Sequence, residues 1–313
     1  MAKQKKIQFS AGNLWGIDLG GTKIEGAILK SFDKPEVLFR ERVPTEAENG
    51  YEHICKQVGK LVDMMIDRAG RKPKTIGIGT PGINDPKTGT MKNCNTVEMN
   101  GKPLKKDLEK LLGMKVEMAN DADCFALAET LIGVVKEDFP KARVVFGVII
   151  GTGVGGGIVI DGKPIIGLQG IAGEWGHNFL DESGGECYCG KTGCVEKLIA
   201  GPALEKYYYT ETGNKKPLKD IVAVAESKSD PTAQRTMLRL IDFYGKSMSV
   251  VINILDPDVI VIGGGVGNIS LLYDRGRDAI KKYVFNNTLD TPIVRPSLGD
   301  SAGVFGAAFL TQK

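Results

Sequence analysis

Three of the six cysteines lie within eight residues, and one of the two histidines lies shortly before them. His177 precedes the segment Cys187-x-Cys189-Gly190-x-x-Gly193-Cys194. One imidazole nitrogen and three thiolates make the closed tetrahedral ligand set that structural zinc prefers, and nearby glycines let the backbone fold around one ion. The alternative is three incidental buried thiols beside a solvated histidine. The spacing favours a structural Zn²⁺ site formed by His177, Cys187, Cys189 and Cys194.

Carboxylates lie on both sides of this cluster and at the end of a predicted strand. Glu174 lies three residues before His177, and Glu196 lies two residues after Cys194. A metal-braced loop would hold both glutamates in place, which suits a polyol whose hydroxyls donate to carboxylates; for either glutamate alone, surface charge is the alternative. Asp121 follows Asn120 where a strand passes into a helix, so it is a candidate general base for an attacking hydroxyl, with plain N-capping as the alternative.

Glycine-rich turns follow three predicted apolar strands, at 18–23, 151–157 and 263–265. Glycine lets backbone N–H groups approach an anion and form a concave nest, whereas in a simple hairpin the glycines would supply only positive φ. Asp18 and Thr22 frame the first turn. Three such turns after strands favour phosphate binding.

Two of the glycine patterns resemble nucleotide motifs that their surroundings contradict. Gly151-x-Gly153-x-x-Gly156 fits the dinucleotide fingerprint, which requires a following helix, but the β-branched strand 158–160 follows here. The segment 185–192 formally fits a P-loop, yet polar residues precede it and it contains two of the proposed metal ligands. We therefore reject both readings.

Strands and helices that could position these residues alternate along the chain. Each half opens with a strand, a glycine turn and a second strand, which predicts an imperfectly duplicated α/β fold. A chain of 313 residues exceeds the roughly 250–300 residues of one core, so two lobes with a boundary near Asn120 are expected. The pattern predicts strands at 14–19, 24–29, 74–79, 116–119, 143–150, 158–160, 259–262 and 293–294, and helices at 51–68, 104–112, 121–132, 194–200, 218–226, 232–255, 271–284 and 302–310.

Composition and charge argue against two classes of partner. The net charge is +3, and basic residues gather only at Lys3, Lys5 and Lys6, so no nucleic-acid partner is expected. No apolar run approaches the roughly 18 residues of a membrane span, and the run after Lys6 is too short for a signal peptide. We expect a cytoplasmic protein that binds neither nucleic acid nor a membrane.

With these motifs in view, the chain resembles the ROK family, which contains sugar kinases and sugar-responsive repressors. The combination of Glu174-x-Gly176-His177 with Cys187-x-Cys189 is highly specific to this family, whereas the glycine turns are shared with actin-like and hexokinase ATPases. The resemblance runs nearly end to end and rests on 17–23, 79–82, 119–122, 151–157, 172–177, 187–196 and 253–265.

The resemblance implies a ribonuclease-H-like, actin/hexokinase-type fold with ATP between two lobes. The small lobe would comprise 1–120 and 300–313, and the large lobe 121–299 with the zinc loop and a homodimer surface. Asp121 would be the catalytic base, Asp18 would orient Mg²⁺, and His177 would use one ring nitrogen for zinc and the other for a sugar hydroxyl. The sugar would be bound by Gly82, Asn120, Asp121, Glu174, His177 and Glu196, and ATP by Asp18, Gly20, Gly21, Thr22, Lys23, Gly151, Thr152, Gly153, Gly263, Gly264 and Gly265.

The activity expected from this resemblance is ATP-dependent phosphorylation of a hexose, at O6, with a fructose-, mannose- or glucose-type substrate. The residues around Glu174 and Cys187 look closest to the fructokinase and mannokinase branch, although that branch often has more than the nine residues found here between His177 and Cys187. The alternatives are an N-acetylhexosamine kinase, an actin-like ATPase switch, or a sugar-responsive regulator. Only seventeen residues precede Asp18, too few for a regulator's helix-turn-helix domain.

Overall fold

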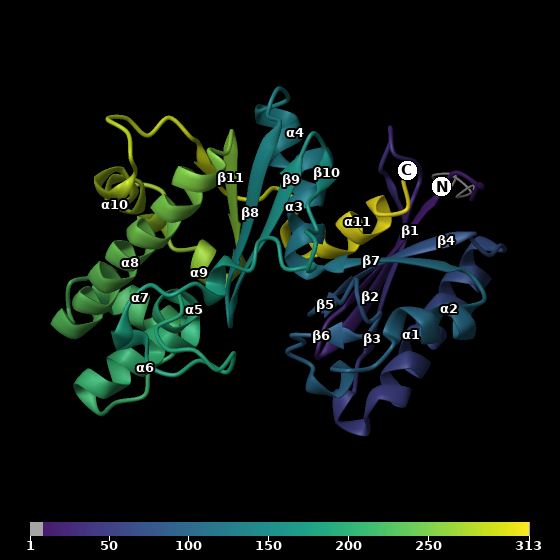
Figure 1. The fold of residues 1–313 in the computed structure, drawn as a ribbon, viewed down its shortest axis with the longest axis horizontal. Helices are drawn as coiled ribbons and strands as arrows, with labels where there is room; N and C mark the ends of the chain where they lie inside the picture. The colour runs from purple at the N-terminus through teal and green to yellow at the C-terminus, as the bar shows by residue number, and fades with distance from the viewer. Residues whose placement is uncertain (1–8, 313) are drawn as a thin grey trace, which may run out of the picture. The chain divides into compact units, whose positions relative to one another are not determined.

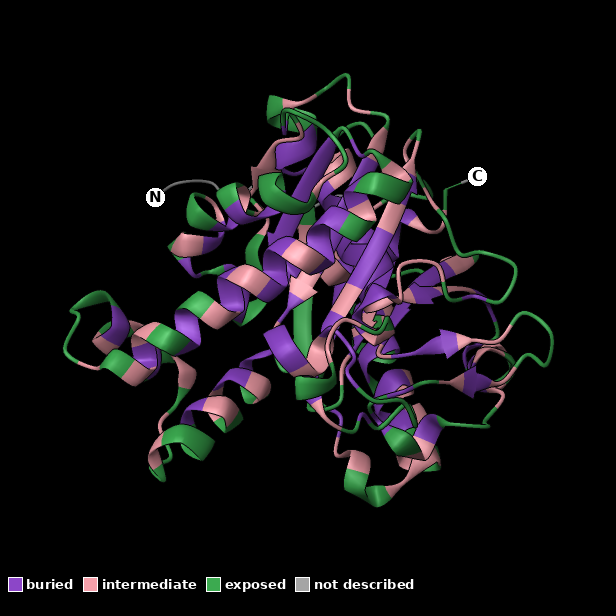
Figure 2. Ribbon diagram, turned by 60° about the vertical axis from the view of Figure 1, so that its left-hand side comes forward, coloured by how far each residue is buried: buried purple, intermediate pink, exposed green. Residues whose placement is uncertain are grey.

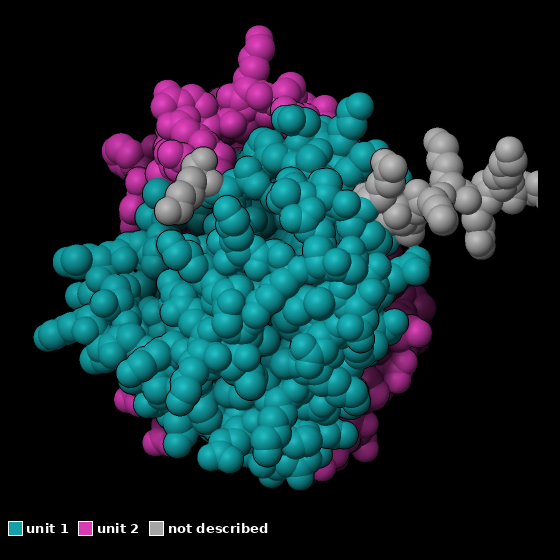
Figure 3. Space-filling model, turned by 90° about the vertical axis from the view of Figure 1, so that its right-hand side faces the viewer, with its two compact units in different colours: residues 1–133, 164–172, 298–313 teal, residues 134–163, 173–297 magenta. Residues whose placement is uncertain are grey.

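The computed structural model describes residues 9–312 and contains two compact units. Unit 1 comprises 1–133, 164–172 and 298–313, and unit 2 comprises 134–163 and 173–297 (Figure 3). Asn120 was the expected boundary, whereas this division falls after Gly133. The reason is that the helix after Asn120 packs on the C-terminal helix of unit 1, where a Cβ on Gly306 would lie 1.8 Å from the carbonyl oxygen of Cys124.

Unit 1 is built on a five-stranded sheet with the order β3-β2-β1-β4-β7 (Figure 1). The first three strands are antiparallel neighbours, and β4 and β7 add in parallel. The three central strands in this order are almost wholly buried, which suits strands covered on both faces, whereas the edge strand β3 is largely exposed. The strands are β1 (Leu14–Leu19), β2 (Lys23–Leu29), β3 (Val37–Pro44), β4 (Thr75–Thr80) and β7 (Lys115–Asn120), with a small β5 (Ile83–Asn84) and β6 (Met91–Lys92) hairpin beside them.

Two helices of unit 1, at 51–69 and 104–112, bury one apolar face each, whereas the helices at 121–131 and 302–309 are buried nearly all round. The buried residues of α1 (Tyr51–Ala69) recur at helical spacing, as the sequence predicts. Helix α11 (Ala302–Phe309) approaches β1 and β4 so closely that a Cβ on Gly77 would lie 1.7 Å from the carbonyl oxygen of Ala307. The remaining helices are α2 (Leu104–Leu112) and α3 (Asp121–Leu131).

Unit 2 repeats the same strand scheme with the sheet order β10-β9-β8-β11-β12. Strand β8 pairs antiparallel with β9 and parallel with β11, as β1 pairs with β2 and β4 in unit 1. The predicted duplication is therefore confirmed. The strands are β8 (Val144–Ile150), β9 (Val154–Ile160), β10 (Lys163–Pro164), β11 (Val259–Gly263) and β12 (Ile293–Val294).

Helix α8 (Pro231–Leu255) supplies much of the apolar core of unit 2, together with the strands. Figure 2 shows buried residues following most strands and alternating with exposed residues along the helices. None of the helices within residues 9–312 is long and apolar enough to cross a membrane. The other helices are α4 (Val134–Asp138), α5 (Glu196–Ile199), α6 (Gly201–Thr212), α7 (Leu218–Glu226), α9 (Gly264–Gly267) and α10 (Arg275–Tyr283).

The second glycine turn is shorter than predicted. Strand β9 already begins at Val154, so Gly155, Gly156 and Gly157 lie in the β8–β9 ladder rather than in a turn. A Cβ on Gly156 would lie 2.8 Å from Trp175 and 2.8 Å from Phe146, so packing of these rings requires glycine there. The dinucleotide fingerprint requires a helix after this turn. Strand β9 follows instead, which confirms that the fingerprint was rightly rejected.

Candidate functional site

The His177 and cysteine side chains converge at one point in unit 2. Each offers a ligand atom, and these atoms all lie within 4.8 Å of one another. A tight loop positions them: the N–H of Cys187 donates to the carbonyl of Lys191 at 2.8 Å, and that of Gly193 to the carbonyl of Gly185 at 2.9 Å. The predicted grouping of His177, Cys187, Cys189 and Cys194 is thus present.

The spacing of the ligand atoms suits a tetrahedral cation. The Sγ atoms of Cys189 and Cys194 are 3.6 Å apart, and His177 Nδ1 lies 3.6 Å from Cys187 Sγ. A tetrahedron with metal–sulfur bonds of about 2.3 Å has edges of about 3.8 Å. Burial raises the pKa of the Cys194 thiol to about 12, with neighbouring thiols adding to the rise. A bound divalent cation would deprotonate such a thiol.

Two glutamates flank this cluster, as the sequence predicts. Glu196 begins α5, and its Oε2 accepts the N–H of Val154 at 3.0 Å, beside Gly153, where a Cβ would lie 2.7 Å from that oxygen. The cluster is therefore tied directly to the second glycine turn. Burial raises the pKa of Glu174, His177 opposes the rise, and Glu196 adds to it.

Unit 1 brings the other predicted sugar-binding residues together. Strands β4 and β7 are parallel with Thr80 opposite Asn120, so the loop after β4 lies beside the start of α3. Thr80 Oγ1 lies within hydrogen-bond distance of the carbonyl oxygens of Gly82 (2.9 Å) and Ala119 (3.2 Å), which its one O–H can bridge. Asn120 caps α3, and the Oδ1 atoms of Asn120 and Asp121 both accept the N–H of Ala122, at 2.9 and 2.7 Å. The N-cap alternative is real for Asn120, but it does not preclude a second role for Asp121.

The first glycine turn joins β1 to β2, and Asp18 lies just before it. The N–H of Gly20 closes the turn by donating to the carbonyl of Lys23 at 3.0 Å, so the proposed phosphate donors in this turn are the later amides. Burial, with a smaller contribution from Glu25, raises the pKa of Asp18 to about 6. The sequence reasoning missed Glu25, which lies opposite Asp18 across the strands and is held by Arg40 and Arg42.

The second and third glycine turns lie side by side in unit 2. A Cβ on Gly264 would lie 2.4 Å from the carbonyl oxygen of Ile150, and one on Gly151 would lie 3.9 Å from the amide of Gly265. The N–H of Gly201, at the start of α6, donates to the carbonyl of Gly151 at 2.8 Å. Residues 151–153 and 263–265 thus form one cluster, which α6 adjoins.

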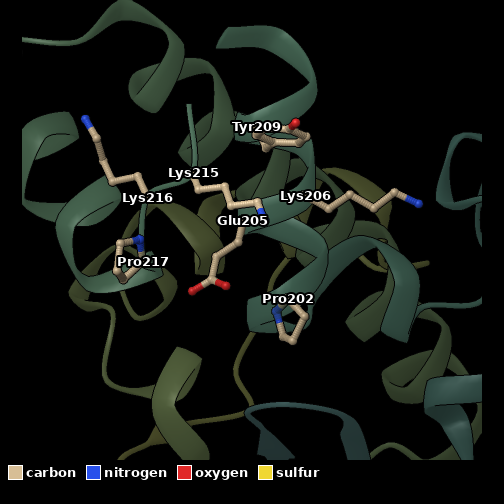
Figure 4. Close-up of a pocket in the computed structure, with 7 residues that line it drawn as sticks. All are labelled: Pro202, Glu205, Lys206, Tyr209, Lys215, Lys216 and Pro217. Atoms are coloured by element: carbon tan, nitrogen blue, oxygen red, sulfur yellow. The ribbon is translucent and has the colours of Figure 1, made fainter. Parts of the chain in front are cut away.

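A cavity of about 470 Å³ opens along α6, and the sequence reasoning missed it (Figure 4). It begins at Pro202, next to Gly201 and hence next to the glycine turns. Glu205 is fixed because its Oε1 accepts the N–H of Leu218 at 2.7 Å. The lining residues are Pro202, Glu205, Lys206, Tyr209, Lys215, Lys216 and Pro217.

The predicted rejection of a P-loop at 185–192 is confirmed by the local structure. A short 3-10 helix (Glu182–Gly184) precedes the segment where a P-loop needs a buried strand, and the segment itself folds around the cysteine cluster.

Comparison with known proteins identifies the family of this chain. The sequence profile of the ROK family matches residues 14–313. The chain belongs to the ROK family. It is 36% identical over 309 residues to the N-acetyl-D-glucosamine kinase of Vibrio atlanticus, covering 96% of this chain and 99% of that protein. The enzyme of the same name from Citrobacter koseri is 36% identical over 315 residues, covering 95% and 98%.

Solved structures confirm the expected fold. A ROK hexokinase from Thermus thermophilus superimposes with a TM-score of 0.83 at 32% identity, covering 95% of this chain and 97% of that one. A ROK family glucokinase from Streptomyces griseus, solved with glucose and AMPPNP, gives a TM-score of 0.77 at 27% identity, covering 96% and 99%. The duplicated α/β fold of actin/hexokinase type is therefore the fold of this ROK-family chain.

Proposed function

We propose that this ROK-family sugar kinase transfers the γ-phosphoryl group of ATP to the 6-hydroxyl of N-acetyl-D-glucosamine. The similarity that supports this sugar is the 36% identity, over nearly the whole chain, to enzymes named for it. The residues around Glu174 and Cys187 favoured fructose or mannose as the substrate. The proposed sugar differs because the relatives with 36% identity are named for N-acetyl-D-glucosamine.

The observation that carries the sugar-kinase chemistry is the grouping of Glu174, His177 and Glu196 around the cysteine cluster. Carboxylates and an imidazole N–H can together accept from and donate to the hydroxyls of one sugar. An ATPase that binds no sugar would not require these two carboxylates and the imidazole at one place.

The cluster also fits Zn²⁺, which we assign to His177, Cys187, Cys189 and Cys194. Four protein ligands would close the coordination tetrahedron, so bound zinc would brace the loop structurally and leave no coordination position for substrate. The residues themselves then do the binding, because the braced loop holds Glu174, His177 and Glu196 in fixed positions.

In the proposed reaction the sugar 6-oxygen attacks the γ-phosphorus while the bond to the leaving ADP oxygen breaks. Asp121 accepts the proton of the attacking hydroxyl, and Asn120 and the Gly82 loop orient the sugar. Mg²⁺ bound with ATP would neutralise phosphate charge, with Asp18 orienting it.

For the nucleotide we assign the turns at 21–23, 151–153 and 263–265 to the phosphates. Pro202, which lines the cavity along α6, follows Gly201, whose N–H donates to the carbonyl of Gly151 in the second of these turns. With a volume of about 470 Å³ the cavity is of the size range of small-molecule sites, and we assign it to the nucleoside.

A sugar panel with ATP tests the proposal. We expect kcat/KM for N-acetyl-D-glucosamine to exceed that for glucose, mannose, fructose and N-acetyl-D-mannosamine by about tenfold or more, the range one small group can give in a binding pocket. Glucose is the second candidate, because the glucokinase from Streptomyces griseus, solved with glucose and AMPPNP, is 27% identical with a TM-score of 0.77. A higher kcat/KM for glucose would replace the proposed substrate, and ADP release that is independent of any sugar would overturn the kinase.

A further inference from the structure

The second ring nitrogen of His177 is engaged by a residue that the proposed function does not use. Tyr188 lies between Cys187 and Cys189 in sequence, and its hydroxyl oxygen is 3.0 Å from His177 Nε2. The two rings meet edge to face, with centroids 5.2 Å apart and an interplanar angle of 87°. Nδ1 of the same ring faces Cys187 Sγ at 3.6 Å.

These contacts fix which nitrogen does what. A cation held by the cysteines takes the lone pair of Nδ1, so a neutral imidazole must carry its proton on Nε2. Nε2–H then donates to the hydroxyl oxygen of Tyr188. Such a partner on the second nitrogen holds the orientation of a metal-binding histidine.

Tyr188 occupies the position that a sugar hydroxyl would need. One N–H makes one well-aligned hydrogen bond, so a ligand that reaches His177 Nε2 must replace the Tyr188 oxygen. The side chain is 67% exposed, and it lies near enough to Glu174 and Glu196 to feel both charges. An exposed ring on two torsions can turn away at little cost.

We propose that Tyr188 is a cap on His177 that sugar displaces: its hydroxyl accepts from Nε2–H in the sugar-free protein, and a sugar hydroxyl takes its place. The identity of the ligand as a sugar rests on the proposed function. The cap has two consequences: it competes with sugar, and it supports the metal-binding histidine whenever sugar is absent.

The test is Tyr188→Phe, which keeps the ring and removes the competing hydroxyl. We expect KM for N-acetyl-D-glucosamine to fall about 2- to 10-fold, the worth of one neutral hydrogen bond, with kcat within twofold. The matched control is Tyr283→Phe, which removes an exposed tyrosine hydroxyl bonded to Asp242 at 2.7 Å elsewhere in unit 2. The control should change neither constant.

Zinc release supplies a readout independent of turnover. Purified protein is mixed with a chromogenic zinc chelator, without ATP, in the absence and presence of saturating N-acetyl-D-glucosamine. Without sugar we expect Tyr188→Phe to lose zinc about tenfold faster than the wild type, the low end for a lost partner of a histidine ligand. With sugar the two proteins should release zinc equally, because the sugar hydroxyl now bonds Nε2 in both.

Several results would overturn the cap. A raised KM in Tyr188→Phe would make Tyr188 a direct sugar contact, and a zinc-release difference that persists with sugar would show that Tyr188 stays on His177. Equal release without sugar, or wild-type protein without zinc, would also contradict it. If the wild type phosphorylates no sugar, the proposed function fails, while the sugar-free release comparison still decides whether Tyr188 supports His177.

Discussion

Asp121 accepts a backbone hydrogen bond through one oxygen, which allows its chemical role to be separated from its structural one. In the wild type the N–H of Ala122 donates to Asp121 Oδ1 at 2.7 Å. The amide oxygen of Asp121→Asn can still accept this hydrogen bond, so the start of α3 should remain intact. An amide cannot take the hydroxyl proton. We expect kcat to fall about 10²- to 10⁴-fold, with sugar affinity within a few-fold of the wild type.

Coupled ADP release and calorimetric titration with sugar measure these two quantities. Asp67→Asn, which changes an exposed carboxylate on α1, is the control and should leave both unchanged. An Asp121→Asn variant that retains most of its kcat would remove Asp121 from the role of base.

Residue spacing predicted the cysteine cluster because its ligands lie in one short loop. Spacing also predicted the position of Asn120 and Asp121, because both lie where one strand ends and the next helix begins. By contrast, Glu196 reaches Val154 at 3.0 Å because α5 packs beside the β8–β9 hairpin. Glu25 is opposite Asp18 only through strand register. Contacts of that kind depend on pairing between distant segments, which spacing alone does not reveal.

At the scale of elements, the N-terminus of α8 depends on Asp230. Its Oδ1 accepts the N–H groups of Thr232 (2.9 Å) and Ala233 (3.0 Å), and its Oδ2 accepts the Tyr208 hydroxyl at 2.6 Å. The Tyr208 bond, followed by the backbone bonds and Lys216, lowers the pKa of Asp230 to about 2. The ionised carboxylate is therefore the form that stabilises the fold.

We expect Asp230→Ala to lower the urea midpoint at pH 7, with Asp230→Asn, which still caps, losing less. Because the pKa is lowered on folding, the contribution is fully present above the ordinary value of 3.8 and is lost as pH falls through about 2. The difference in midpoint between wild type and Asp230→Ala should thus stay level from pH 7 to about 4 and narrow below. A difference that grows on acidification would contradict this assignment.

Long periodic elements were predicted well, and short or glycine-rich ones were not. Helix α7 matches its predicted range, and α8 starts one residue early because Asp230 caps it. Helix α6 was missed: Gly201 and Pro202 at its start suggest a loop, and adjacent tyrosines disguise its apolar face. Gly155–Gly157 were assigned to a turn because glycine is a poor strand former, yet Trp175 and Phe146 pack over β9 there.

At the scale of the whole molecule, the same strand scheme occurs in both units, and the repeated strand–glycine–strand pattern predicted it. The pattern did not show how closely the C-terminal helix would approach the first sheet. That approach depends on Gly16 and Gly77, where any side chain would meet the backbone of α11. The chain's last helix therefore belongs to unit 1, although most of the chain separates it from β1.

One surface of unit 2 is the candidate interface for the homodimer expected from the sequence. Near the end of α8, the exposed Val250 and Ile254 are four residues apart and so form a short row on one helix face. Phe285, 95% exposed, is held beside the end of this row because its N–H donates to Asn253 Oδ1 at 2.8 Å. Contiguous exposed apolar side chains of this kind mark association surfaces.

We predict that two copies pair through this face about a two-fold axis, as most homodimers do. Light scattering of the wild type should then give about twice the 33.7 kDa chain mass. The double variant Ile254→Glu with Phe285→Glu should give the single-chain mass, because it would bury four uncompensated carboxylates in the pair. Leu111→Glu places one carboxylate per copy at an exposed leucine on α2 of unit 1 and should remain dimeric. A monomeric wild type would contradict the dimer, and a double variant that stays dimeric would move the interface away from the α8 face.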